Sequence, residues 1–195
     1  QQALNLRASV GQARIENLIK PFTDLPITGW MTSTNQIRGT LSNPMVRGQF
    51  HAWDGSIYGK LYSDIKADYT YVNHNLYVPI FSGTSYGATI MGAGNIQNGQ
   101  LNFNFLGNDI DLGPILSNVP GHIQGYASVQ GQLRGSLANP KFSGQMASQS
   151  IIMNGSQLTN LQGSVSADKH NLELGNFSFD QGKDGHYVVK GAMGL

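Results

Sequence analysis

The five histidines are the first residues in this sequence that could do chemistry, and their surroundings argue against metal binding. His74 and His170 lie in Asn-His-Asn and Lys-His-Asn, two turn-like sequences far apart in the chain. A turn role explains both histidines better than a shared ion, which would need several ligands close together. The sequence His-Ala-Trp-Asp at 51–54 has no serine or cysteine partner in a recognisable arrangement. The histidines therefore predict neither a metal centre nor a catalytic triad.

Other chemical motifs are equally incomplete. Asp109 and Asp111 flank one apolar residue, and calcium loops need more oxygen ligands than this pair supplies. We expect the two aspartates to cap a short helical segment that begins near Leu112. The sequence Gly-Ala-Gly at 92–94 is not followed by the third glycine or the helix of a dinucleotide-binding loop. The sequence thus predicts no catalytic residue, no metal and no cofactor, and a protein that is not an enzyme.

The composition favours short strands joined by tight turns. Glycine contributes 25 of 195 residues, and charged residues make up only 12 %; a helical protein would carry more Glu, Lys and Arg on its surface. The net charge is +1, and the 12 Lys and Arg residues form no basic run, which argues against nucleic-acid binding. Cysteine is absent, which excludes disulfides and thiolate metal sites. No apolar run approaches the ~20 residues of a membrane-spanning helix.

One sequence occurs twice. IRGTLSNPMVRGQ at 37–49 returns as LRGSLANPKFSGQ at 133–145, and the same offset relates 27–30 to 123–126 and 73–76 to 169–172. A short apolar stretch that could be helical precedes each copy, at 15–21 and 111–116. We therefore expect a single elongated β segment over 1–195 that contains repeat A at about 15–107 and a truncated repeat B at about 111–195, cut from a longer protein.

Most of the remaining chain alternates between apolar and polar residues, which is typical of strands with one dry and one wet face. The runs at 101–105, 123–137 and 161–168 show this clearly. Turn-forming pairs separate the runs at 43–44, 54–55, 73–75, 98–99, 139–140, 154–155, 168–171 and 184–185. The pattern predicts an all-β antiparallel meander.

The repeated motif has two open interpretations. Its Asn-Pro pair interrupts the chain between two strands, because proline fixes φ and lacks a donor. The flanking Gly39, Gly48, Gly135 and Gly144 fall on the apolar side of the alternation. They mark either a bulge or sheet corner, or space left for a bound molecule.

A sheet with one apolar face must bury that face. Two short helices are too few to cover it. A second layer of sheet would give a sandwich or barrel with an ordinary protein core. The third arrangement is a trough that holds an apolar guest, and a repeat of this length would place about six to eight strands side by side.

The pattern G-x-L-x-N-P-x-x-x-G at 39–48 and 135–144 resembles the repeats of the TamB family, an AsmA-like group of envelope proteins in diderm bacteria. Leu-x-Gly-x-Val at 161–165 and the Gly-rich run at 185–194 extend the resemblance over nearly all of the chain. The resemblance implies a β-taco, an antiparallel sheet curled into a U-shaped trough with an apolar interior and one or two very short helices. It also implies a location in the periplasm, with the parent protein anchored in the inner membrane by a segment outside this sequence.

The resemblance further implies phospholipid transfer between the inner and outer membranes, with a linked role in outer-membrane protein assembly and secretion. The expected partners are phospholipid acyl chains, neighbouring repeats of the same protein and, through other parts of the parent, a TamA-like outer-membrane barrel. No nucleic acid is expected. The residues expected to line the groove are apolar and stand at alternate strand positions: Ile65, Leu76, Val78, Ile80, Leu101, Phe103, Phe105, Ile123, Val129, Leu133, Leu137, Phe142, Met146, Val165, Leu172, Leu174, Phe177 and Phe179.

Two alternatives stay open at this point. The chain could be a structural or adhesive surface rod whose Asn, Gln and Tyr residues bind glycans or proteins. Its open edge strands could also recruit a further strand, from another copy or from an unfolded outer-membrane protein.

Overall fold

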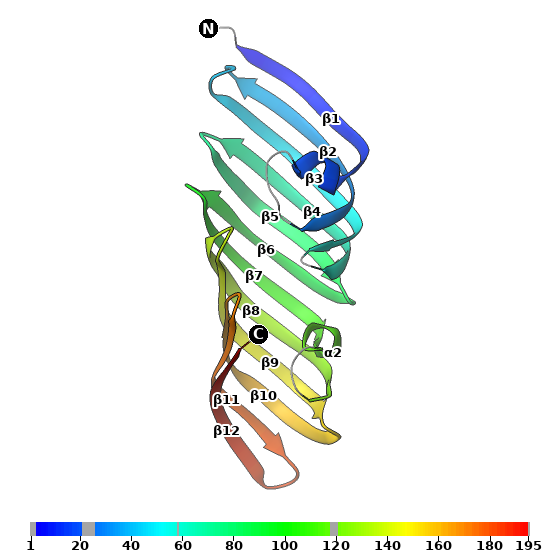
Figure 1. Cartoon of the computed structure of the whole chain (residues 1–195), viewed down its shortest axis with the longest axis vertical. Helices are drawn as coiled ribbons and strands as arrows, with labels where there is room; N and C mark the ends of the chain where they lie inside the picture. Colours follow the sequence, from blue (N-terminus) through cyan, green and yellow to red (C-terminus); the bar gives the residue numbers. More distant parts are fainter. Residues whose placement is uncertain (1–2, 21–25, 58, 118–120, 195) are drawn as a thin grey trace. The chain divides into compact units, whose positions relative to one another are not determined.

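The computed structural model describes residues 3–20, 26–57, 59–117 and 121–194. These residues form one antiparallel sheet whose twelve strands follow one another in chain order (Figure 1). The strands are β1 (Leu4–Arg14), β2 (Ile27–Gly39), β3 (Pro44–Ile57), β4 (Lys60–Val72), β5 (Asn75–Ser85), β6 (Ala88–Gln97), β7 (Gln100–Asp111), β8 (Ile123–Ser136), β9 (Pro140–Met153), β10 (Ser156–Ala167), β11 (Asn171–Gln181) and β12 (Gly185–Gly194). The predicted all-β meander is confirmed.

Two very short helices accompany the sheet, at the places that the sequence predicted. The first, α1, covers Ile15–Ile19, and the second, α2, covers Leu112–Ile115; Pro21, at the end of the first predicted stretch, lies outside the described residues. Asp111 is the N-cap of α2 and accepts a hydrogen bond from Gly113 N at 3.0 Å, as expected. Asp109 instead has a φ of 55° where the β7–β8 register shifts. Among the described residues, no helix is long and apolar enough to span a bilayer.

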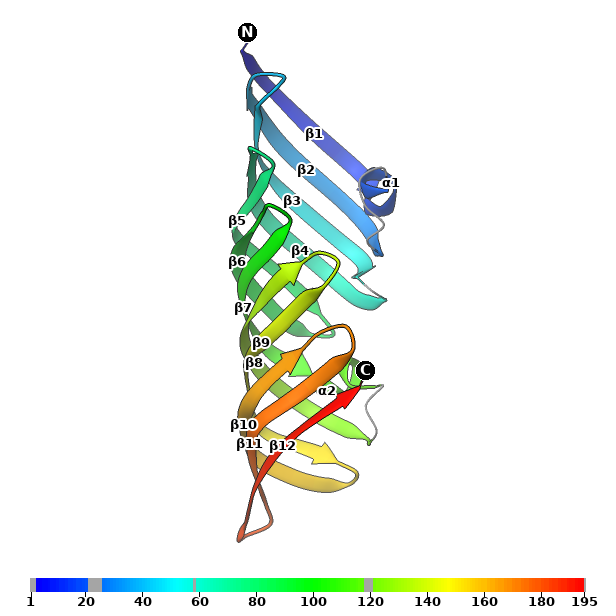
Figure 2. The same ribbon diagram turned by 60° about the vertical axis from the view of Figure 1, so that its left-hand side comes forward.

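The chain divides into two compact units. Unit 1 contains residues 1–86 and 91–99, and unit 2 contains residues 87–90 and 100–195. The sheet is open, because β1 and β12 stand at the two ends of the strand order (Figure 2), and it is not strongly curled or closed. The open meander therefore lacks the deep U-shaped curl that the family resemblance implies.

The repeated sequence motif forms the same hairpin turn in both units. Gly39 and Gly135 each have a φ of 98°, a conformation that glycine adopts at little cost. In the first turn Asn43 N donates to Thr40 O at 3.1 Å, and Asn139 N makes the equivalent bond, also 3.1 Å long, in the second turn. Pairing between strands then begins at the proline that follows each asparagine. The requirements of this turn explain why the motif recurs.

Other predicted turns are also confirmed, with one exception. Asn73 and His74 have φ values of 50° and 62° between β4 and β5, as two-residue hairpins require. The Asp54-Gly55 pair does not form a turn but lies inside β3. Asp54 has a φ of 50°, and the register between β2 and β3 shifts beside it. A residue with positive φ can mark a bulge as well as a turn, so the prediction at 54–55 was wrong.

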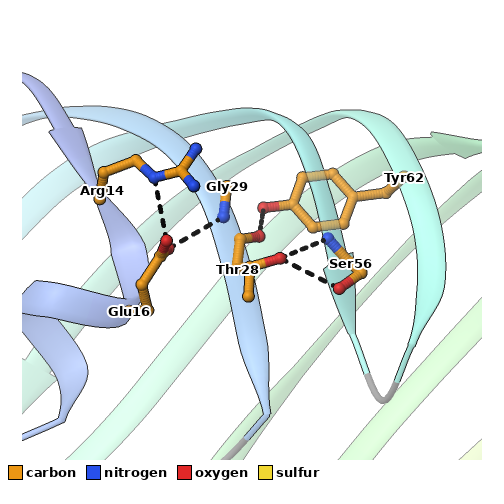
Figure 3. A network of polar contacts seen from close by, with 6 residues as sticks. All are labelled: Arg14, Glu16, Thr28, Gly29, Ser56 and Tyr62. Carbon is orange, nitrogen blue, oxygen red and sulfur yellow. Dashed lines mark hydrogen bonds and ion pairs between the residues drawn. The ribbon is translucent and has the colours of Figure 1, made fainter.

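A polar network holds α1 against the sheet of unit 1 (Figure 3). Glu16 forms an ion pair with Arg14 at 2.9 Å and accepts a hydrogen bond from Gly29 N at 3.1 Å. Tyr62 reaches from β4 to β2, where its hydroxyl donates to Thr28 O at 2.8 Å. The Tyr62 ring belongs to a buried cluster of side chains from α1 and the sheet, which also contains Ile15, Met31 and Ala52.

Candidate functional site: the apolar sheet faces

One face of unit 2 is apolar from β7 to β12. Residues directly opposite each other in paired strands share a face, so the register defines rows of side chains that cross the sheet. The first row contains Phe103, Leu133, Phe142, Ala167, Leu172 and Met193. The second row contains Phe105, Gly131, Gly144, Val165, Leu174 and Gly191. We call this surface the apolar face of unit 2.

The opposite surface of the same strands is polar. The row between the two apolar rows contains Asn104, Gln132, Ser143, Ser166, Glu173 and Ala192. Since successive residues of a strand point to opposite sides, the two sets of rows face away from each other. We call this second surface the polar face of unit 2.

Among the described residues, no second layer of sheet lies over the apolar face of unit 2. Within each unit, the extensive contacts between described elements join sheet neighbours, or a short helix and the strands beside it. Leu112 of α2 takes part in a buried cluster with Ile110, Ala127 and Ile151 at one end of the strands. Along the two rows, by contrast, large side chains such as Phe103, Phe142 and Val165 remain only half-buried, and no large described side chain is fully buried.

Glycines on this face lie beneath aromatic rings of the same chain. A Cβ built on Gly131 or Gly144 would collide with the Phe142 ring, and one built on Gly163 would collide with Phe177. Covering a glycine in a strand with an aromatic ring restores part of the packing that the missing side chain forfeits. The space above these glycines is therefore filled by the protein's own rings and is not left for a guest.

Unit 1 has an equivalent face that is interrupted by polar groups. One row is apolar or aromatic and contains Leu6, Ile37, Val46, Tyr71 and Leu76. Beside this row, the Tyr69 hydroxyl donates to Asn35 Oδ1 across Gly48, and Asn35 Nδ2 donates to Ser33 Oγ at 3.1 Å. Burial raises the pKa of Tyr69. We call this surface the apolar face of unit 1, and the three hydrogen-bonded residues the polar cluster.

The predicted groove residues lie on these two faces with two exceptions, Ile80 and Leu137. Val78 is buried at a bulge in β5. Beyond that bulge Ile80 pairs with Asp68 on the polar side and is 58 % exposed, because the extra residue reverses the alternation. Leu137 follows the last residue of β8 and is 42 % exposed in the turn.

The set of expected groove residues omitted several members of the apolar faces. Leu158 and Leu161 are both buried in the core cluster of unit 2. They stand three residues apart, because Asn160 has a φ of 53° and the β10–β11 register shifts nearby. A strict period of two cannot place both on one side. The asparagine between them is the only signal in the sequence that could have indicated the shift.

The titratable groups of the polar faces form pairs that are partly exposed to solvent. His51 Nε2 lies 2.6 Å from Asp64 Oδ1, and Lys66 Nζ lies 3.1 Å from Asp64 Oδ2. The hydrogen bond with His51 is the main reason that the pKa of Asp64 is lowered. His186 and Asp180 make a similar contact of 2.7 Å. The described residues contain no group of three or more His, Cys, Asp or Glu that could hold a metal ion.

Comparison of this chain with protein-family models, with curated proteins and with solved structures found no match. What the fold defines is a class of architecture: an open antiparallel meander with one apolar face and one polar face.

Proposed function

We propose that this chain is a non-enzymatic segment that shields the acyl chains of phospholipids on its apolar faces. The observation that carries the proposal is the apolar face of unit 2, which presents half-buried Phe, Leu and Val side chains in rows and is not covered by another layer of the described chain. An apolar surface of this kind needs an apolar partner. Acyl chains match it because they need no hydrogen bond in return.

The hydrophobic effect supplies both affinity and mobility in this proposal. Burying a methylene group gains roughly 0.8 kcal/mol, so two acyl chains of about thirty carbons would gain on the order of 20 kcal/mol if fully desolvated. A wall of similar apolar rows offers nearly the same gain at each position along it. A lipid can therefore move from row to row without a large barrier, while its head group stays in water.

We further propose that the sheet bends around a bound lipid to form a U-shaped trough. Register shifts cross unit 2 between Gly107 and Ile110 in β7, between Gly125 and Ser128 in β8, and again in β10 and β11. Bulges bend strands and increase their twist, so successive bulges across neighbouring strands give the sheet a place to fold. The trough is then the lipid-bound form of the open sheet.

The wider assignment is to a TamB-like envelope protein. It is supported by the doubled motif and by the equal construction of the two series of strands, β1–β6 and β7–β12, in each of which a short helix follows the first strand. In this proposal the segment lies in the periplasm of a diderm bacterium, between neighbouring repeats of a parent protein anchored in the inner membrane. It passes phospholipid between the two membranes and assists outer-membrane protein assembly and secretion with a TamA-like barrel.

Photo-crosslinking in cells tests this function. A photoreactive amino acid is placed at Phe103 and at Val165 on the apolar face, and at the adjacent Asn102 and Ser164 on the polar face as matched controls. We expect lipid adducts, identified by mass spectrometry, at the first two positions and few at the controls. Equal labelling of both faces, or no lipid adduct at any position, would contradict the proposal.

A further inference from the structure

Three arginines gather on the polar side of unit 1, although they are widely spaced in the sequence. The register places Arg7 of β1 opposite Gln36 of β2, and Gln36 opposite Arg47 of β3. Arg38 follows two residues after Gln36 and points to the same side. Arg7 and Arg47 are thus two strand spacings apart, about 10 Å, with Gln36 between them. The sheet builds a basic site that the linear sequence does not show.

These arginines are not neutralised by carboxylates. Arg7, Arg38 and Arg47 are exposed, and the ion pairs of the described residues involve Arg14, Lys66 and histidines instead. Arg38 donates from Nε and Nη2 to the Gln36 amide oxygen, at 3.2 and 2.8 Å, when that amide is oriented to satisfy both of its groups. Arg7 and Arg47 keep their guanidinium donors for another partner.

An open depression of about 720 Å³ lies between Arg7 and Arg47, a volume within the range of small-molecule sites although it is less enclosed than most of them. Its lining is mixed in polarity and includes the hydroxyl residues Ser9, Thr34 and Thr70, together with Gln36, Gln49 and Asp68. The Asp68 carboxylate accepts a hydrogen bond from Gln49 Nε2 at 3.1 Å. The site therefore combines two free guanidinium groups with several neutral hydrogen-bonding groups and one carboxylate.

We propose that this depression binds a saccharide that carries a phosphate group. Guanidinium groups bind phosphate through paired, charge-assisted hydrogen bonds, so Arg7 and Arg47 hold the phosphate above Gln36. Asp68 accepts hydrogen bonds from sugar hydroxyls. The threonine hydroxyls and Gln49 form the remaining hydrogen bonds to the sugar. The carboxylate also disfavours a second anion at that end, which distinguishes the ligand from a polyanion. This site is independent of the lipid-binding proposal, because it lies on the opposite side of the sheet.

Unit 2 provides an internal control for this inference. At the repeat positions that correspond to Arg7 and Arg47 it has Asn104 and Ser143, on either side of Gln132. Arg134 is its counterpart of Arg38. Unit 2 thus keeps the central glutamine and one arginine but lacks the flanking pair.

The test is a titration of the whole isotope-labelled chain with glucose 1-phosphate, followed by NMR at physiological salt of ~0.15 M, where weak surface pairing is largely screened. We expect saturable shifts at Gln36, Thr34 and Thr70. Arg7→Gln and Arg47→Gln should each weaken binding at least about tenfold, as for loss of a charge-assisted hydrogen bond. Arg134→Gln should leave binding unchanged, and thermal unfolding should show that all three variants fold.

Parallel titrations decide the ligand class. Weaker binding of both inorganic phosphate and glucose would support the proposal, because it requires both halves of the ligand. Inorganic phosphate that binds as tightly as glucose 1-phosphate would overturn it. So would binding to phosphatidylcholine vesicles containing phosphatidic acid without binding to glucose 1-phosphate, since the partner would then be an anionic membrane. Loss of binding in Arg134→Gln alone, or no saturable shift, would also overturn it.

Discussion

Units 1 and 2 share one plan but differ on both faces of the sheet. Unit 1 interrupts its apolar face with Ser33, Asn35 and Tyr69, where the repeat places Val129, Gly131 and Val165 in unit 2. On the polar side, unit 1 has the flanking arginines that unit 2 lacks. A duplicated backbone has thus acquired two surfaces of different chemistry, because the turns and registers fix the fold while the residues between them can vary.

The short helices differ in the same way. In unit 1, α1 is tied to the sheet through the side chain of Glu16, which contacts Arg14 and Gly29. In unit 2, α2 is capped by Asp111 and contributes Leu112 to a larger buried cluster. Both helices bury an apolar side chain, Ile15 in α1 and Leu112 in α2, and α1 is attached in addition through the ion pair and hydrogen bond of Glu16. The two units should therefore respond differently to pH and to changes in packing.

The largest effect is expected for a glycine that lies under a ring. Gly131→Ala places a methyl group against the Phe142 ring and 2.8 Å from Ser143 O, so it should cost about 2–3 kcal/mol of unfolding free energy. Gly191→Ala is the matched control on the same face, because a Cβ there meets nothing within 4 Å. Urea unfolding followed by circular dichroism measures both. Equal stability of the two variants would show that the Phe142 ring does not prevent a side chain at position 131.

A charge in the second row of the apolar face of unit 2, which contains Val165, should sharply reduce lipid binding by that unit. Val165→Asp introduces a carboxylate that must be desolvated beside an acyl chain, so bound phospholipid per chain should fall at least about fivefold. Ser164→Asp adds the same charge on the polar face and should leave the lipid content unchanged. Mass spectrometry of organic extracts gives the ratio. A similar loss in both variants would indicate a general effect of charge and contradict the proposed role of this face.

The polar cluster of unit 1 should contribute to stability through one hydrogen bond. Tyr69→Phe removes the hydroxyl that donates a hydrogen bond to Asn35 Oδ1. This change should lower the free energy of unfolding by about 1 kcal/mol. Tyr71→Phe should cost almost nothing, because the Tyr71 hydroxyl makes no hydrogen bond to the described residues. Replacing Asn35 by Gly and Tyr69 by Val together copies unit 2 and should raise the bound lipid per chain. No gain of lipid would mean that the cluster does not limit binding.

The smallest effect concerns acid pH and α1. The pKa of Glu16 is lowered by hydrogen bonds from its own backbone and from Gly29 N, and by Arg14. Because the folded pKa lies below the unfolded value, this contribution is present above the unfolded pKa of about 4.3 and is lost as pH falls through the folded pKa. The Gly29 amide resonance should therefore move as the pH falls through the lowered pKa of Glu16, and Glu16→Gln should abolish that movement. A Gly29 resonance that does not respond to acid would contradict this attachment.

Local patterns were sufficient to predict much of this fold. Alternation and turn pairs such as Asn73-His74 identified an antiparallel meander, because hairpin chemistry and face periodicity act within a few residues. Bulges defeated the same reasoning: the positive φ at Asp54 falls inside β3, and the bulge before Ile80 turns that side chain to the polar side. The basic site could not be predicted from local patterns either, since only the pairing of three strands brings Arg7 and Arg47 near each other.

The most direct test of the central claim is methyl NMR of the chain with a phospholipid that carries a nitroxide on its acyl chain. The methyl groups of Leu133 and Val165 report on the apolar face of unit 2, and those of Ala147 and Ala192 report on its polar face. We expect strong broadening of the first pair and little of the second. Equal broadening of both pairs, or none, would show that the uncovered apolar face does not hold acyl chains.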